Sequence, residues 1–197
     1  MNVEPRQNGS GCAIPERTSF QVRPDQAAVV LIARSSAGPI TFGTAGIVGS
    51  IQAEMAGESI LTESPPTASL EVPVSNFTSG NHFYDGELLR RIDARRYPAA
   101  KVELHRAVAV GQTGRYHVEG ELTFHGVTQP LEGMVEITFP TPGTILVQGR
   151  QVLDMRHFGI TPPAVAMLKI YPDVRVELHL EATIGDLGAS PAPREAS

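Results

Sequence analysis

The stretch VRVELHLEATI, at residues 174–184, decides the fold class of this chain. Its apolar residues recur at every second position, and the positions between them hold Arg, Glu, His, Glu and Thr. Successive side chains of a β-strand point to opposite faces of a sheet, so one face of this segment suits burial and the other suits water. The alternation predicts a strand of an antiparallel sheet.

The same period of two recurs elsewhere in the chain. Tyr116, Val118 and Leu122 alternate with polar neighbours. Residues 27–35 form an almost continuous apolar run, which indicates that both faces of this strand are covered. Glycines within 40–55 are typical of a strongly bent strand or of two strands that meet at a bulge. We predict strands at 27–35, 40–55, 68–75, 100–109, 115–125, 130–139, 144–153 and 173–184.

Short connections join the predicted strands. His125–Gly126 and Pro140–Gly143 have the residue types of hairpin turns. Repeated hairpins imply an up-and-down meander of about eight strands, and closing the meander removes its exposed edges. The predicted fold class is therefore all-β, an antiparallel β-barrel of about eight strands with one short helix.

One region lacks the alternation and is predicted to be that helix. Asp85 is expected to cap it, and Leu88, Leu89 and Ile92 lie on one of its sides. We interpret a cluster of four arginines as the solvated side of this helix. They are Arg90, Arg91, Arg95 and Arg96.

The chain is predicted to form one domain, because 197 residues suit a single all-β core. Residues 1–18 are polar and rich in glycine and proline, and they are predicted to be a flexible N-terminal segment. Residues 19–185 are predicted to form the barrel domain, and residues 186–197 a disordered C-terminal tail. The single cysteine, Cys12, rules out a disulfide within the chain.

Charge and hydropathy narrow the function classes. The net charge is -5 and the basic residues are largely scattered, which argues against a nucleic-acid partner. Residues 1–12 lack the apolar core of a secretory signal, and no segment is long and apolar enough to span a bilayer. We predict a cytoplasmic protein without stable membrane insertion; a homodimer stays open.

A barrel of this size is either filled by side chains or just wide enough for one slender ligand. The chain has no Trp, and Gly120, Gly133 and Gly149 fall on the inward parity of their strands. This composition favours a tunnel over the alternative, an ordinary filled core. The candidate lining residues are Val30, Ile32, Leu70, Val72, Val102, Leu104, Tyr116, Val118, Leu122, Phe124, Val135, Ile137, Val147, Val176 and Leu178.

Three segments occur in an order that is found in a known family. They are SGNHFYDGELLRRIDARRYPAAKVEL at residues 79–104, YHVEGELTFHGVTQPLEG at residues 116–133 and RHFGI at residues 156–160. On these segments the chain resembles the YceI-like family of polyisoprenoid-binding, lipocalin-like proteins. The resemblance extends from Phe20 to about Ile184.

The resemblance implies a lipocalin-like barrel that holds a long apolar ligand in its lumen, such as a polyisoprenoid or the tail of a polyprenyl quinone. It implies binding or carriage rather than catalysis, with no cofactor apart from such a ligand. The chain departs from the family pattern at Arg34, where a histidine is common, and at His157, where an acidic residue often follows the arginine. We therefore expect different polar contacts at the pocket mouth.

A few side chains are candidates for contact with a ligand head group or for a gate. His82 and Tyr84 lie just before the predicted helix, where they either bind a ligand head group or cap the local backbone. The guanidinium group of Arg156 offers donors to an anionic or quinone oxygen. An ion pair at a strand end is the alternative role of Arg156. The candidate gates or plugs, in which methionine packs adaptably, are Met155, Phe158, Met167 and Leu168.

No catalytic or metal-binding motif accompanies these residues in the sequence. The six histidines include no pair at metal-ligand spacing, and a nucleophile elbow and a phosphate loop are both absent. We predict a binding protein whose partner is a long-chain apolar small molecule. The alternatives are an enzyme that acts on a lipid or quinone in the same barrel, and a ligand-free barrel that mediates protein interaction.

Overall fold

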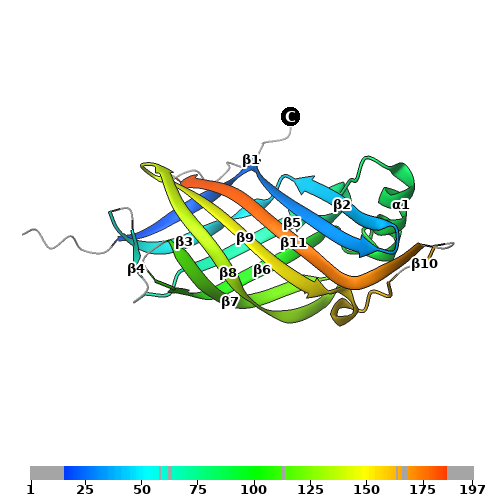
Figure 1. Cartoon of the computed structure of the whole chain (residues 1–197). Coiled ribbons are helices and arrows are strands. Elements are labelled where there is room, and N and C mark those ends of the chain that lie inside the picture. The colour runs from blue at the N-terminus through cyan, green and yellow to red at the C-terminus, as the bar shows by residue number, and fades with distance from the viewer. Residues whose placement is uncertain are drawn as a thin grey trace, which may run out of the picture.

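The wall of the molecule is a closed antiparallel barrel of eight strand positions, which confirms the predicted fold class (Figure 1). Cys12, Met167 and the chain ends at 1–15 and 186–197 lie outside the residues that the structure describes. The computed structural model describes residues 16–57, 59–61, 64–111, 114–162, 164–165 and 168–185.

Within the barrel wall, β2 and β3 share one position because they pair with successive halves of the same strand. The short strands β4 and β10 are additions at the ends of the wall. The strands are β1 (Glu16–Ser35), β2 (Gly38–Ala45), β3 (Val48–Ala56), β4 (Ser59–Leu61), β5 (Thr67–Pro73), β6 (Ala99–Ala109), β7 (Arg115–Phe124), β8 (Val127–Thr141), β9 (Thr144–Asp154), β10 (Ala164–Val165) and β11 (Leu168–Ile184). The helices are the 3-10 turns η1 (Val74–Asn76) and η2 (Met155–Phe158) and the α-helix α1 (His82–Arg91).

Strand β1 closes the barrel, because it pairs with β11 along one edge and with β2 and β3 along the other. Its register with β11 shifts between Val22 and Ala27, where the polar run 23–26 interrupts the alternation. The predicted strand at 27–35 is therefore only the second half of β1. The first half begins at Glu16, inside the segment predicted to be flexible.

Two predicted connections have the backbone that their residue types favour. Gly46, with a φ of 83°, lies between β2 and β3 and forms the predicted bend. His125 and Gly126, with φ of 52° and 76°, join β7 to β8, as a two-residue hairpin with two left-handed residues requires. A Cβ atom on Gly126 would lie 2.7 Å from the ring of Tyr97, so this position also needs glycine for space.

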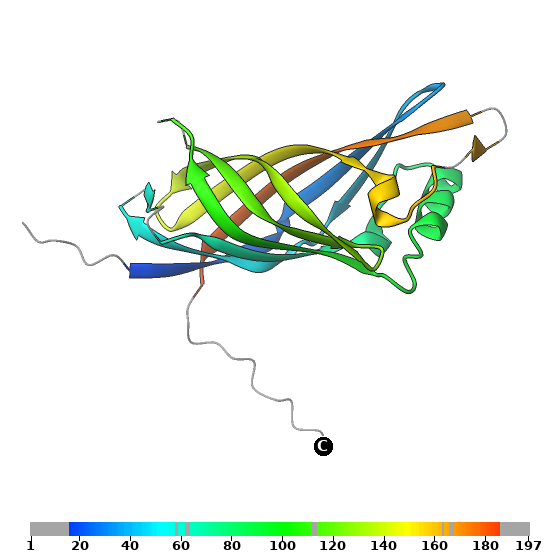
Figure 2. The ribbon, with the colours of Figure 1, turned by 90° about the horizontal axis from the view of Figure 1, so that it is seen from below.

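Helix α1 lies at one end of the barrel (Figures 1 and 2). It begins after Asn81, whose side chain accepts hydrogen bonds from the backbone N–H groups of Phe83 and Tyr84. The prediction that Asp85 caps the helix is wrong. The Asp85 carboxylate lies in the first turn and accepts hydrogen bonds from the backbone N–H and the hydroxyl of Ser79. No helix of the described residues has the length and hydropathy to span a membrane.

The opposite end of the barrel, where β1 begins (Figure 2), holds tightly buried side chains. Phe20, Ile145, Leu180 and Ala182 are each 2% exposed or less. The pairings of β11 with β1 and β9 bring these four residues together. The barrel is thus closed by its own core at one end, and the space that remains lies toward α1.

Candidate ligand-binding site

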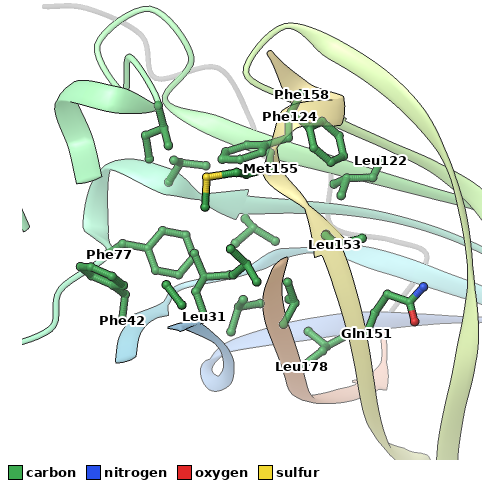
Figure 3. Close-up of a pocket in the computed structure, with 18 of the residues that line it drawn as sticks. Leu31, Phe42, Phe77, Leu122, Phe124, Gln151, Leu153, Met155, Phe158 and Leu178 are labelled. Carbon is green, nitrogen blue, oxygen red and sulfur yellow. The ribbon is translucent and has the colours of Figure 1, made fainter. Parts of the chain in front are cut away.

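A cavity of about 310 Å³ lies inside the barrel at the α1 end (Figure 3). Strands β1, β2, β5 to β9 and β11 supply its wall, and α1, η1 and η2 supply its rim. Most of the lining side chains are aliphatic or aromatic, because they occupy the inward parity of alternating strands. The arrangement offers a ligand an extended apolar surface with few hydrogen-bonding groups.

Aromatic rings stand on two sides of this cavity. Phe42 and Phe77 lie together on one side, and Phe124 and Phe158 lie together on another (Figure 3). The ring centroids of Phe124 and Phe158 are 5.7 Å apart in an edge-to-face arrangement. Phe158 belongs to η2 and Phe77 follows η1, so both 3-10 turns hold an aromatic ring against the cavity.

Charged and amide side chains of the described residues reach the cavity in two places only. One place is α1, through Glu87 and Arg91. The other place is the wall between β8 and β9, where the Gln151 side chain lies on the inward parity of β9. A polar part of a ligand would therefore find hydrogen-bonding partners at these two places and nowhere deeper.

The α1 mouth, formed by residues 83–91, combines a paired carboxylate with an exposed aromatic ring. Glu87 accepts hydrogen bonds from Arg90 and Arg91, each with a shortest distance of 2.7 Å, and these bonds hold the pKa of Glu87 below its ordinary value. Phe83 lines the cavity yet is 61% exposed, and its ring meets Tyr84 edge-to-face at 6.0 Å. The mouth therefore presents a large apolar side chain to solvent.

The second polar place coincides with a gap in backbone pairing. Strands β8 and β9 pair as far as Met134 and Arg150, and beyond this point β8 continues beside β7 while β9 continues beside β11. We call this gap, between residues 127–133 and residues 151–154, the β8–β9 seam. Pro130 lies in it, and a proline suits an edge that has no ladder partner because it donates no backbone hydrogen bond.

Side chains bridge the β8–β9 seam. The Gln151 amide donates to the Glu132 carbonyl oxygen at 2.8 Å. The Gln129 amide donates to the His157 carbonyl oxygen at 3.0 Å and so ties β8 to η2. The wall of the cavity is held here by glutamine amides instead of a backbone ladder.

Comparison with known proteins identifies this barrel. The YceI-like domain model matches residues 20–182. The chain belongs to the YceI-like family. Its membership confirms the resemblance that the three sequence segments indicated. No curated protein matches the chain at a significant level.

Solved structures share the YceI-like fold at low sequence identity. BcnA of Burkholderia cenocepacia is 18% identical, with a TM-score of 0.68 over 82% of this chain and 99% of that chain. A polyisoprenoid binding domain from Saccharophagus degradans is 15% identical, with a TM-score of 0.67 over 86% of this chain and 100% of that chain. The YCEI protein of Campylobacter jejuni is 14% identical, with a TM-score of 0.58 over 71% of this chain and 82% of that chain.

Most of the predicted site residues of this YceI-like protein line the cavity. Their contact with a ligand stays a prediction, but the structure brings them to one space. Met155 and Leu168, predicted as gates, also line it. The predicted site residues at the cavity are Leu70, Val72, Tyr84, Val102, Leu104, Val118, Leu122, Phe124, Val135, Phe158, Val176 and Leu178.

For the first predicted strand of this YceI-like protein, the prediction of which residues face inward is wrong. Val30 and Ile32 do not line the cavity, and their neighbours Val29, Leu31 and Ala33 do. The run around them is apolar on both parities, so alternation carries no information about which face is inward.

Tyr116, Ile137 and Val147 are buried but do not line the cavity. They lie on the inward parity that was predicted, toward the filled end of the barrel, where Val147 pairs with Leu180. Burial raises the pKa of the Tyr116 phenol, which forms a hydrogen bond with the backbone of Ile60. These side chains contribute to the packed core and not to the cavity wall.

His82 and Arg156 lie outside the cavity. His82 is exposed at the first turn of α1. Arg156 donates from Nε to both carboxylate oxygens of Asp154 at 3.0 Å, and its hydrogen bonds lower the pKa of Asp154 to about 2. The alternative role of Arg156, an ion pair at a strand end, is confirmed, because Asp154 is the last residue of β9.

The sequence analysis missed several lining residues of this YceI-like protein, including Phe42, Phe77 and Glu87. Among these missed residues, Gln151 could have been found from the sequence pattern. It lies on the same parity as Val147 and Leu153, so it is a polar residue on the inward face of its strand. Within the described ranges, no group of His, Cys, Asp or Glu side chains is arranged to hold a metal ion.

Proposed function

We propose that this protein binds and carries a long apolar lipid, such as an isoprenoid or a polyprenyl quinone, with the apolar chain in the cavity. The observation that carries the proposal is a cavity of about 310 Å³ whose lining is apolar except at the α1 mouth and the β8–β9 seam. The relative from Saccharophagus degradans, described as a polyisoprenoid binding domain, supports the ligand class.

Burial of the ligand chain supplies the driving force. Removal of apolar surface from water contributes about 25 cal/mol per Å². Part of this gain offsets the lost freedom of a flexible chain. The cavity wall formed by residues such as Leu104, Val118 and Leu178 offers no hydrogen bond, so a hydrocarbon chain is favoured there over a polar one.

The same argument sets the orientation of the ligand. Its apolar end would lie toward the filled end of the barrel, where the core around Leu180 blocks further entry. Its polar end would lie at Glu87 and Arg91 or at Gln151, where the lining has donors and acceptors.

The lining supports carriage over chemical conversion. The described lining residues include no Ser, Cys, Lys or His, which are the common nucleophiles and bases of enzymes. Glu87 and Arg91 are bonded to each other, and Arg150 is paired with Glu177 at 3.0 Å. We therefore propose that the ligand leaves the cavity unchanged.

Native mass spectrometry of the purified full chain, followed by organic extraction, tests the proposal. We expect an isoprenoid or a related apolar molecule in a defined stoichiometry. The double variant Val176→Phe/Leu178→Phe places two rings in the cavity and should abolish retention. The matched control is Val152→Phe, which changes a side chain that is 58% exposed and absent from the lining, and should retain the ligand.

Three outcomes would contradict the proposal. Wild-type protein that stays bare after incubation with polyprenyl quinones and with fatty acids would contradict lipid binding. Normal retention by a folded Val176→Phe/Leu178→Phe variant, verified by circular dichroism, would contradict the cavity as the site. Release of a chemically altered ligand would contradict carriage and support an enzyme.

A further inference from the structure

The end of the barrel that holds the cavity also exposes aromatic side chains. Phe83 on α1 is 61% exposed, and Tyr171 near the start of β11 is 37% exposed. Phe83 also lines the cavity, as does Leu168 at the start of β11. Figure 2 shows α1 and the start of β11 at the same end of the barrel. Apolar surface therefore extends from the cavity to the outside of the protein at this end.

Unpaired basic side chains lie at the same end. Arg95 and Arg96 are exposed in the turn that follows α1. Lys169 is exposed on β11, with its Nζ 5.7 Å from the ring centroid of Tyr171. Among the residues that the structure describes, these three cations are in no ion pair.

Most carboxylates at this end are already neutralised by arginines. Asp85, Asp93 and Glu132 are the exceptions, and Asp85 is held by the Ser79 hydroxyl. This end therefore has more basic than acidic side chains, although the whole chain has a net charge of -5. The ion pairs here are Glu87 with Arg90 and Arg91, Asp154 with Arg156, and Asp173 with Arg34.

We infer that the α1 end docks on the surface of an anionic lipid bilayer. Phe83 and Tyr171 enter the interfacial layer, and Arg95, Arg96 and Lys169 contact lipid phosphates. This contact places the mouth of the cavity at the membrane. The consequence that a lipid passes directly between bilayer and cavity rests on the proposed function, whereas the docking itself does not.

General physical chemistry favours an anionic bilayer as the partner of the α1 end. Aromatic side chains prefer the membrane interface, because their rings are apolar and their edges tolerate polar neighbours. Basic residues beside them are attracted to anionic head groups within about a Debye length. The remainder of this acidic chain is repelled by the same head groups, so the attraction also orients the barrel with its α1 end toward the membrane.

Sedimentation of the full chain with vesicles tests the electrostatic part. We expect binding to phosphatidylcholine vesicles that contain phosphatidylglycerol, weaker binding to phosphatidylcholine alone, and loss of binding at high salt. Arg95→Gln/Arg96→Gln should lower partitioning about thirtyfold at low ionic strength. The matched control, Arg17→Gln/Arg115→Gln, changes the net charge equally at the filled end and should bind like wild type.

A second pair of variants tests the aromatic part. Phe83→Ser should lower partitioning into vesicles of both compositions. Ile184→Ser, which removes a side chain that is 55% exposed at the filled end, should not. Equal loss in the α1-end variants and in their controls would overturn the inference, as would wild-type binding that is independent of phosphatidylglycerol.

A solution measurement separates this inference from the proposed function. Arg95 and Arg96 do not line the cavity, so Arg95→Gln/Arg96→Gln should bind decylubiquinone without vesicles as wild type does, as measured by native mass spectrometry. Wild type that binds anionic vesicles but no decylubiquinone or extracted lipid would contradict the proposed function and leave docking intact. Wild type that binds decylubiquinone but ignores anionic vesicles would overturn docking alone.

Discussion

At the scale of single residues, Arg156 sets the pH at which the carboxyl group of Asp154 titrates. Hydrogen bonds from Arg156 hold the pKa of Asp154 at about 2, below its ordinary 3.8. A carboxyl whose pKa is lowered on folding adds stability that is present above about pH 4 and is lost as the pH falls through about 2. We expect Arg156→Gln to raise the pKa of Asp154 toward 3.8 and to reduce this acid dependence of unfolding, while the backbone N–H of residue 156 still donates to Asp154.

Carbon-detected NMR titration of the Asp154 carboxyl measures this shift. Arg150→Gln is a suitable control, because Arg150 pairs with Glu177 on another part of the barrel and should leave Asp154 unchanged. If Asp154 titrated at the same pH in wild type and in Arg156→Gln, the ion pair would not be the cause of the shift.

Gly120 and Gly133 share the inward parity but have different reasons to be glycine. A Cβ atom on Gly120 would clash with the backbone oxygen of Glu103, whereas one on Gly133 would meet nothing nearer than Gln151 at 3.7 Å. We expect Gly120→Ala to lower the free energy of unfolding by about 3 kcal/mol and Gly133→Ala to change it by about 0.5 kcal/mol or less. Urea denaturation measures both, and equal effects would contradict the close approach of β6 and β7 at Gly120.

At the scale of elements, the β8–β9 seam is a part of the wall that lacks a backbone ladder. We expect residues 127–133 of β8 to exchange amide hydrogens faster than residues 134–136, which pair with both neighbouring strands. Gln151→Leu should accelerate exchange further in residues 127–133, because the Glu132 carbonyl loses its partner. Hydrogen exchange followed by mass spectrometry resolves the two segments.

Gln148→Leu provides the control for this element. Gln148 lies on the outer face of β9 and bonds with His179, away from the seam. Uniform exchange along β8, or acceleration by Gln148→Leu as large as by Gln151→Leu, would contradict a seam closed by the Gln151 amide.

The inward face of a strand could be predicted where its other face is polar. Features that depend on which strands pair with each other could not be predicted. β7 and β11 alternate cleanly, so their inward sides followed from parity. The second half of β1 is apolar on both parities, and its phase was therefore predicted wrongly. The seam depends on where β8 leaves β9, which is a property of tertiary pairing and not of either strand alone.

At the scale of the whole molecule, stability and cavity occupy opposite ends of the barrel. Leu180 is fully buried at the filled end, and Leu178, two residues earlier on β11, is half-buried at the cavity. We expect Leu180→Ala to lower the free energy of unfolding by about 4 kcal/mol. Leu178→Ala should cost about 1 to 2 kcal/mol, because this side chain already borders empty space.

Chemical denaturation and lipid retention, measured on the same two variants, check this division. Leu178→Ala should also weaken retention of the extracted lipid, and Leu180→Ala should not do so under conditions in which it is folded. A larger loss of stability in Leu178→Ala would contradict the division between the two ends.

The filled end could not be distinguished from the open end in the sequence. Tyr116 and Val118 follow the same alternation on one strand, yet only Val118 reaches the cavity. The difference arises from side chains of distant strands, such as Phe20 and Leu180, which occupy the lumen at one end only. The alternation of residues along a strand identifies its inward face. The empty volume of the barrel lumen depends on the summed volume of all inward side chains.

This division of the barrel bears on how such proteins diverge. Under the proposed function, a substitution near Leu178 would alter which molecule fits, while the packing around Leu180 keeps the chain folded. Under the same function, selection for a new ligand would thereby be uncoupled from selection for a stable scaffold. The barrels of Burkholderia cenocepacia and Saccharophagus degradans share the fold at 18% and 15% identity.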